Sequence, residues 1–194
     1  MGEIGFKEKL QKREEFQATG DDIPEFRWDE LIPDIFIPLT KANLSQIEVG
    51  MIWYEDDTCS FDWLPIKSMK AIIECIDENK IYGDLTISDC FKITEHEFDW
   101  DDAKRYFENF SYPCKENEKI VWYSKKLLEK VANNYHVVSI TFDFLWRKAR
   151  EGFYWSSTEL NSTAAWVKDF SNGSRDTYSK DNNFCVRPVL EFEL

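Results

Sequence analysis

Cysteine is the residue type in this chain best suited to covalent or metal chemistry, and its spacing argues against both. The five cysteines stand at positions 59, 75, 90, 114 and 185. They form no Cys-x-x-Cys pair and leave one over, which is typical neither of a zinc site nor of a full disulfide framework. A lone cysteine within a predicted strand, such as Cys185, is more often a small buried hydrophobic residue.

The histidines form no catalytic or metal-binding pattern either. His96 lies in the run Thr-Glu-His-Glu, which lacks the second histidine of a His-Glu-x-x-His zinc site, and His136 lies between a predicted helix and a predicted strand. The sequence also has no Gly-x-Ser-x-Gly, no phosphate-binding glycine-rich loop and no dinucleotide fingerprint. We therefore predict that the protein is not an enzyme and has no catalytic residues.

Carboxylates are the remaining candidates for metal ligands. They cluster at Glu55–Asp57 and at Asp99, Asp101 and Asp102, and carboxylate oxygens suit a hard cation such as calcium. A solvated acidic turn explains the first cluster, and a helix N-terminus, where the dipole favours negative charge, explains the second. The sequence predicts no metal ion and no cofactor.

Composition limits the classes of protein to which these residues can belong. The 194 residues are 43% hydrophobic and 16% aromatic, which is enough for one packed core. The formal net charge of -13 would repel phosphate backbones, so nucleic acid is not an expected partner.

Neither membrane insertion nor secretion is expected. Apolar stretches such as 31–37 and 137–145 are much shorter than the roughly 20 residues of a spanning helix, and proline or aspartate interrupts them. The N-terminus is charged where a signal peptide would be apolar. We expect the protein in the cytoplasm or in a virion assembled there.

Helices are expected mainly in the first two thirds of the chain. Ile66, Met69, Ile73 and Ile76 recur at helical spacing, and Asp99 and Ser124 are suitable N-caps. Prolines make 26–39 extended or irregular, and 51–54 fits a short strand. The expected helices are a loose one over 3–17 and three others over 66–79, 100–110 and 124–134.

Strands are expected after residue 150. The turn Asn172–Gly173 supplies the positive φ of a tight hairpin, and Trp155 and Trp166 are expected in the core. The predicted fold is α+β, with helices followed by a β-rich C-terminal half, in a domain over 46–194 after a helical or irregular extension over 1–45. The expected strands are 153–156, 164–170, 175–178 and 184–190, and 137–144 fits either a strand or the start of a short helix.

Three separated motifs in the C-terminal half resemble a known family. They are Tyr154–Glu159, then Ala165–Val167 with Asp169, Phe170 and Gly173, then Val186–Val189 with the sequence Val-Arg-Pro-Val. In this order they are similar to a bacterial and phage domain family that resembles the C-terminal domain of certain collagen-like adhesins. Weaker matches occur at Trp100–Ala103 and Val121–Ser124.

The resemblance implies a C-type-lectin-like fold, in which the terminal strands pair and an irregular region carries the binding face. Formylglycine-generating enzymes have a similar fold and use paired cysteines near the C-terminus, whereas Cys185 stands alone there and Cys114 is distant. Oxidase chemistry is therefore not expected. The Glu-Pro-Asn and Trp-Asn-Asp elements of calcium-dependent sugar-binding lectins do not occur either.

The resemblance also implies a set of ligand-binding residues. A related group, the variable proteins of diversity-generating retroelements, places its varied residues between matching motifs. Amides, hydroxyls and tyrosine are typical of antibody-like recognition surfaces, but turns select the same polar types, so both interpretations stay open at this point. The implied positions are Asn161, Ser162, Thr163, Ser171, Asn172, Ser174, Arg175, Asp176, Tyr178, Asn182 and Asn183.

We therefore expect a binding and display module, as in adhesion, that recognises a protein or glycan through its C-terminal polar loops. The alternative is a structural or accessory protein of a phage or mobile element that acts through its N-terminal segment. A homo-oligomer or a phage structural protein is a further candidate partner.

Overall fold

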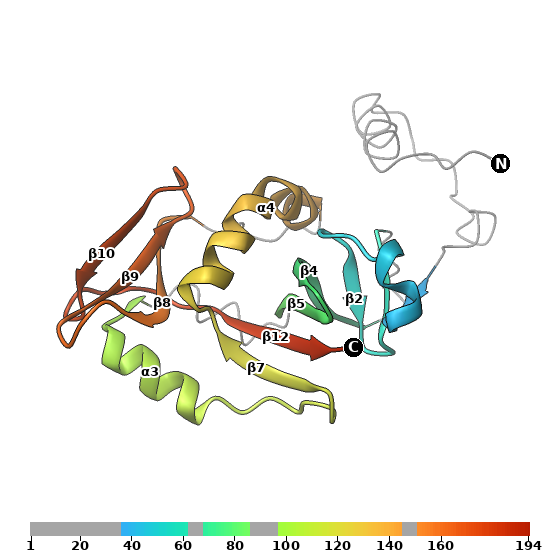
Figure 1. Cartoon of the computed structure of the whole chain (residues 1–194), viewed down its shortest axis with the longest axis horizontal. Coiled ribbons are helices and arrows are strands. Elements are labelled where there is room, and N and C mark those ends of the chain that lie inside the picture. Colours follow the sequence, from blue (N-terminus) through green and yellow to red (C-terminus); the bar gives the residue numbers. More distant parts are fainter. Residues whose placement is uncertain (1–35, 62–67, 86–96, 145–150) are drawn as a thin grey trace, which may run out of the picture. The chain divides into compact units, whose positions relative to one another are not determined.

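Antiparallel sheet dominates the part of the chain that the structure describes, residues 36–61, 68–85, 97–144 and 151–194 of a computed structural model (Figure 1). These residues belong to one compact unit, Phe36–Leu194. The larger sheet has seven strands in the order β1-β3-β2-β4-β5-β12-β7, and the smaller has five in the order β10-β9-β8-β11-β6. Only β11 and β8 pair in parallel among the described strands.

The strands and helices have the following bounds. The strands are β1 (Ile37–Pro38), β2 (Ile52–Tyr54), β3 (Thr58–Ser60), β4 (Met69–Asp77), β5 (Lys80–Leu85), β6 (Glu97–Phe98), β7 (Glu118–Trp122), β8 (Phe153–Glu159), β9 (Ala164–Asp169), β10 (Arg175–Ser179), β11 (Phe184–Cys185) and β12 (Pro188–Glu193). The helices are the 3₁₀ helix η1 (Lys41–Gln46), α3 (Trp100–Asn109) and α4 (Lys125–Phe144).

The order of these elements corrects the predicted fold. Strands β1 to β5 precede α3 in the chain, and the described residues form mainly sheet. The expected α+β fold of C-type-lectin-like type, with helices followed by a β-rich half, is therefore wrong. What the structure has is two sheets, with α3 and α4 inserted between strands of both.

The largest single correction is at 66–79, where the sequence predicted a helix and the structure has β4. Ala71, Ile72 and Ile73 are consecutive, and all three are 0% exposed. A helix of a small domain buries one stripe, but a strand covered on both faces buries successive residues. The helical spacing of isoleucines was therefore incidental to a continuous apolar run.

The two α-helices follow the predicted caps, but α4 is longer than expected. Asp99 caps α3, since its Oδ1 accepts the backbone N–H of Asp102 at 2.7 Å. Ser124 caps α4 through its Oγ and the N–H of Leu127 at 3.2 Å. Helix α4 continues through 137–144, where Val138 is buried, so the alternative of a strand there is wrong.

The predicted strands β8, β9 and β10 are confirmed, whereas the last predicted strand is divided. Its first part, β11, belongs to the smaller sheet and its second part, β12, to the larger. The chain changes sheets at Val186–Arg187, directly before Pro188, which begins β12. Proline lacks the N–H that a ladder needs and is tolerated at the first position of a strand.

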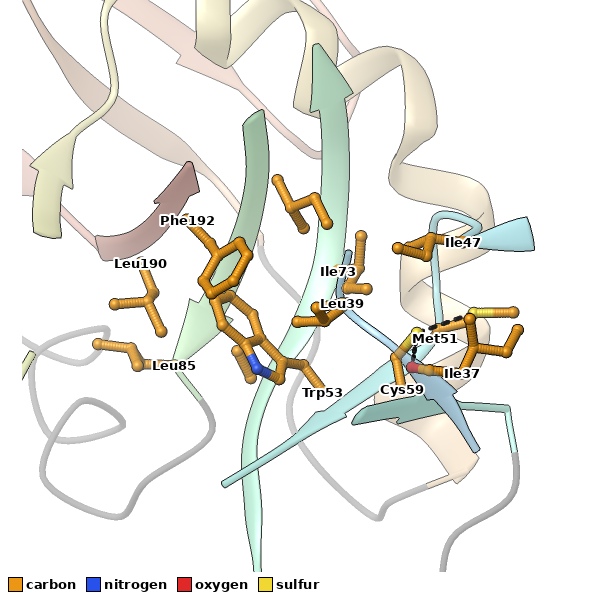
Figure 2. Packing of buried hydrophobic residues seen from close by; sticks show 12 residues of the cluster. Ile37, Leu39, Ile47, Met51, Trp53, Cys59, Ile73, Leu85, Leu190 and Phe192 are labelled. Atoms are coloured by element: carbon orange, nitrogen blue, oxygen red, sulfur yellow. Dashed lines mark hydrogen bonds between the residues drawn. The ribbon is translucent and has the colours of Figure 1, made fainter. Parts of the chain in front are cut away.

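One core lies on one face of the larger sheet. Figure 2 shows Phe192 and Leu190 of β12 beside Leu85 and Trp53, and the rings of Trp53 and Phe192 meet edge to face at 5.3 Å. Gly83 is required here, because a Cβ at this position would lie 2.8 Å from the Cβ of Ala71. The N-terminal strand β1 also contributes to this core, since its Ile37 is buried in the same cluster.

Two further clusters attach the helices. Leu128 and Val131 of α4 pack with Tyr154 of β8 and Val189 of β12, so α4 contacts both sheets. Trp100 and Ala103 of α3 pack on the smaller sheet with Trp155, Ala165 and Val167. Aromatic side chains thus cover the face of the smaller sheet toward α3. The helix predicted at 3–17 and most of the segment 26–39 lie outside the described residues.

Candidate functional site

The predicted ligand residues lie on β10 and in the loops of the smaller sheet, and they form two groups. Because β8, β9 and β10 run antiparallel in turn, the loops 160–163 and 180–183 lie at one end of the sheet. The N–H of Lys180 donates to the carbonyl of Thr163 at 2.9 Å and joins these two loops. The loop 170–174 lies at the opposite end, so the structure does not bring all the predicted residues together.

Most of the predicted ligand residues are exposed to solvent, as contact with a ligand requires. Every residue of the predicted set is exposed except Tyr178, which is half-buried. The ring of Tyr178 packs against Phe153 at 5.6 Å and Phe184 at 5.1 Å between centroids. Tyr178 therefore anchors β10 to the aromatic interior of the sheet.

The side chain of Asn161 forms hydrogen bonds within its own loop. Its Oδ1 accepts the backbone N–H groups of Thr163 and Ala164, both at 2.9 Å, and the Thr163 hydroxyl at 3.1 Å. An asparagine that bonds backbone two residues ahead stabilises a turn. Ser162, at the exposed tip of this loop, takes no part in these bonds.

Ser171 and Asn172 hold the loop at the opposite end in the same way. The Oγ of Ser171 accepts the N–H of Gly152 at 2.8 Å, and the Oδ1 of Asn172 accepts the N–H of Ser174 at 2.7 Å. Gly173 has φ of +73°, as the sequence predicted for this hairpin. The turn interpretation therefore accounts for Ser171 and Asn172.

Strand β10 is an edge of the smaller sheet, and its register defines which backbone groups face outward. The N–H of Asp169 donates to the carbonyl of Ser174 at 3.0 Å, which fixes one end of the pairing with β9. Hydrogen-bonded and non-hydrogen-bonded pairs alternate along an antiparallel ladder. The backbone groups of Arg175, Thr177 and Ser179 therefore point to the open side.

Two predicted ligand residues occupy this open edge. The Oδ1 of Asp176 accepts the N–H of Thr177 at 2.7 Å. Asn182 donates both its backbone N–H and its Nδ2 to the carbonyl of Ser179, each at 3.0 Å. Side chains that bond to the outward backbone groups of an edge strand hinder its pairing with another chain. Asp176 and Asn182 therefore protect β10 from such pairing.

The outer face of β9 carries a group that sequence reasoning did not single out. Along β9, Ala165 and Val167 face the interior, and Trp166 and Lys168 face α4. Trp166 is half-buried, and the Nζ of Lys125, the first residue of α4, lies 3.2 Å from the centroid of its ring. The sequence of 164–169 begins with four consecutive apolar residues and does not alternate with polar ones, so it gives no local signal for this face.

Arg175 joins the same group from β10. It lies opposite Lys168 in the register, and its Nη1 donates to Oε1 of Glu129 on α4 at 2.7 Å. A shallow pocket lies between these side chains. We call the residues Lys125, Glu129, Trp166, Lys168 and Arg175 the outer pocket.

The motif residues of β8 fix this arrangement. The hydroxyl of Thr158 accepts the N–H of Lys125 at 2.9 Å, which attaches β8 to the start of α4. The N–H of Ser157 donates to the carbonyl of Tyr123 at 2.7 Å, and Nε1 of Trp155 donates to the carbonyl of Phe98 at 2.9 Å. The Tyr-Trp-Ser-Ser-Thr run therefore holds the frame that positions the outer pocket.

Asp57 and Asp99, two of the acidic residues considered as cation ligands, have protein partners. Lys70 is 1% exposed and bonds the carboxylate of Glu118, and its Nζ lies 3.7 Å from Oδ1 of Asp57. The Nζ of Lys115 binds Oδ2 of Asp57 at 2.6 Å. Asp57 of the turn Glu55–Asp57 is therefore paired with two lysines. At α3, Asp99 is the N-cap described above.

Cys114, one of the two cysteines considered for oxidase chemistry, does not have an activated thiol. Cys185 is half-buried in β11, and Cys114 is exposed before β7. Burial is the largest cause that raises the pKa of Cys114 above its usual value, and a raised pKa disfavours the reactive thiolate. His136 is exposed on α4, and Cys90 and His96 lie outside the described residues.

Comparisons with known proteins identify no family. Neither a family model nor a curated protein matches this chain. In the described ranges, no three His, Cys, Asp or Glu side chains gather in a way that could hold a metal ion. Neither α3 nor α4, the longest helices of this part, has the length and apolar character needed to cross a membrane.

Proposed function

We propose that the protein is a non-enzymatic binding module whose smaller sheet presents the ligand-contacting residues. One observation carries this proposal: every predicted residue except Tyr178 is exposed, on β10 or in the loops at the two ends of a sheet whose interior is packed with aromatic rings. Trp155 is 0% exposed and lies 4.9 Å from Phe184 between ring centroids. Recognition residues usually lie in loops on such a rigid scaffold.

The proposed contact surface includes fewer residues than the set predicted from the sequence. Asn161, Asn172, Asp176 and Asn182 bond the protein's own backbone, as described above, so they shape the surface. Loop side chains that do not hold turns are the better candidates for contact. They are Ser162, Ser174 and Asn183 in the loops, together with Arg175 of the outer pocket.

A protein or glycan of a cell surface is the proposed ligand. The resemblance of the C-terminal motifs to a bacterial and phage family supports this class of ligand, because display of a binding face is what that resemblance implies. The mixture of hydroxyl, amide and guanidinium groups on exposed positions also suits polar contacts with either ligand. Membership in the family is itself part of the proposal.

A binding screen of the full chain against arrays of cell-surface glycans and proteins tests the proposal. The test variant combines Ser162→Ala, Arg175→Ala and Asn183→Ala. The matched control combines Ser45→Ala, Arg105→Ala and Asn109→Ala, which makes the same residue changes on η1 and α3. We expect the control to keep array binding and the test variant to lose it. Equal binding by both variants would refute the proposed surface.

A further inference from the structure

The geometry points to an acidic sugar, a saccharide ring that carries a carboxylate, as the ligand of the outer pocket. This inference rests on the proposed function and names the class of ligand. Three features of the pocket carry it: a local excess of positive charge, an indole that adjoins one of the cations, and an edge strand on which the Thr177 N–H and the Ser179 carbonyl already have partners.

The first feature is the local charge. The pocket brings together Lys125, Lys168 and Arg175 with a single carboxylate, Glu129, although the whole chain has a net charge of -13. Lys168 is only 9% exposed and its ammonium donates to the carbonyl of Gly173, so it contributes charge, and Lys125 and Arg175 are the cations that a ligand would contact. Charges farther away than about 8 Å are largely screened at physiological ionic strength. A single carboxylate at the pocket therefore experiences mainly the nearby cations, whereas a long polyanion would also meet the acidic surface.

The pKa of Glu129 shows how the surrounding charges affect a carboxylate at this position. Its pKa is lowered first by the hydrogen bond from Arg175, against the smaller opposing effect of burial. The charges of Arg175, Lys125 and Lys168 lower the pKa further. All three cations thus stabilise a negative charge here, and a second carboxylate would compete with Glu129 for Arg175.

The second feature is Trp166 with Lys125 beside it. The ammonium of Lys125 lies 3.2 Å from the ring centroid, and the first turn of α4 is held in place by the hydrogen bond to Thr158 at 2.9 Å. This ammonium covers the centre of one face of the ring, so the C–H groups of a sugar would pack on the remaining exposed part of the indole, which offers an apolar surface of fixed geometry. A cation held at the same indole suits a ring that carries its own carboxylate.

The third feature separates a sugar from an acidic peptide. A peptide would most readily add as a strand to the edge of β10. Asp176 already accepts the N–H of Thr177 at 2.7 Å, and Asn182 already donates to the carbonyl of Ser179 at 3.0 Å. A peptide strand would therefore have to displace both side chains, whereas a sugar in the outer pocket would not.

Titration of the full chain with D-glucuronic acid tests the inference directly. The readout is the indole N–H signals of Trp166 and Trp155 in NMR spectra. Trp155 is 0% exposed, so its signal also reports whether each variant is folded. D-glucose is the neutral control sugar, and acetate and an oligoglutamate peptide are the carboxylates without a sugar ring.

We expect glucuronic acid to shift the Trp166 signal with a millimolar Kd and to leave Trp155 unchanged. Arg175→Gln and Lys125→Gln should each weaken binding about tenfold, which corresponds to about 1.4 kcal/mol. Glu129→Gln should strengthen binding, because it removes the carboxylate that competes for Arg175. The control Lys104→Gln, on α3, should leave the Kd unchanged.

The opposite results would overturn the inference. No shift of Trp166 by glucuronic acid, or an equal shift by glucose, would exclude an acidic-sugar site. Equal or tighter binding of acetate or oligoglutamate would show that the pocket is a site for anions or acidic peptides instead. Weaker binding by Glu129→Gln would contradict a ligand carboxylate that binds Arg175 in place of Glu129.

Failure here is distinguishable from failure of the proposed function. If the array screen detects a ligand that the triple variant no longer binds, but glucuronic acid does not bind, the binding module stands and only the acidic sugar is excluded. If neither experiment detects binding, both proposals fail.

Discussion

Arg187 and Asp84 form a buried ion pair, with side chains only 3% and 2% exposed. Arg187 stands where the chain passes from the smaller sheet to the larger, and Asp84 lies on β5 opposite Val189 of β12. The arginine of the Val-Arg-Pro-Val motif therefore holds the start of β12 against its neighbour, and its role is structural.

Removing one member of this pair should destabilise the protein strongly. We expect Arg187→Met to lower the free energy of unfolding by about 3–5 kcal/mol, because it leaves the charge of Asp84 buried without its countercharge. Urea unfolding of Arg187→Met, Asp84→Leu and the double variant measures the coupling. The double variant should lose less than the sum of the two single losses, and additive losses would contradict a coupled pair.

The two tryptophans of the C-terminal motifs should differ in their effect on stability. Trp155 is 0% exposed and Trp166 is half-buried. We expect Trp155→Ala to cost about 3–5 kcal/mol, and Trp166→Ala to cost about 1 kcal/mol at most. Urea unfolding followed by circular dichroism gives both values. Similar losses for both residues would show that Trp166 belongs to the core, as the sequence alone predicted.

The buried thiols predict a loss of stability at alkaline pH. Burial raises the pKa of Cys59 to about 12 and that of Cys75 to about 11, from an ordinary value of 9.0. Above pH 9.0 the unfolded chain releases these protons while the folded chain retains them. The free energy of unfolding should therefore fall as pH rises from about 9 toward 11.

A variant isolates the contribution of these thiols. Cys59→Ala with Cys75→Ala will be less stable at every pH, but its stability should fall less steeply above pH 9.0. Burial also raises the pKa of Tyr82, and this contribution is common to both proteins. Unfolding free energies at several pH values give the slopes, and equal slopes would show that the thiols are not the cause.

Calcium should leave the stability unchanged. Asp57 is bound by Lys115 at 2.6 Å and approached by Lys70 at 3.7 Å, so a cation would have to replace these ammonium groups. Binding at a hundredfold excess over Kd would stabilise the protein by about 2.7 kcal/mol. Thermal unfolding with millimolar calcium, and with magnesium as the control, should give the same Tm. A selective rise with calcium would contradict the ion-pair account.

The sequence predicted elements best where local chemistry alone decides them. Asp99 and Ser124 are N-caps as expected, and Gly173 has the positive φ that its hairpin requires. The prediction of a helix failed at β4, because Ala71–Ile73 is buried on both faces by elements distant in sequence. The run Ala71–Ile73 is a local signal of a strand covered on both faces, but the isoleucine spacing favoured a helix, and the change of sheet at Arg187 leaves no local signal.

For the candidate site, the sequence predicted which side chains are exposed but not what each of them does. Asn161 and Asn172 have the composition of a binding surface, but their oxygens accept backbone N–H groups. Lys125 and Trp166 are 41 positions apart in the sequence and meet because α4 is held against the smaller sheet, in part by the hydrogen bond from Lys125 to Thr158. Such a pairing is a property of the tertiary structure.

Hydrogen–deuterium exchange of the full chain, with and without the strongest binder from the glycan and protein arrays, tests the central claim most directly. We expect protection to increase in 160–163 and in 175–183, while β4 and β5 exchange equally slowly in both states. Protection that increases only elsewhere in the chain would show that the smaller sheet does not present the ligand-binding face.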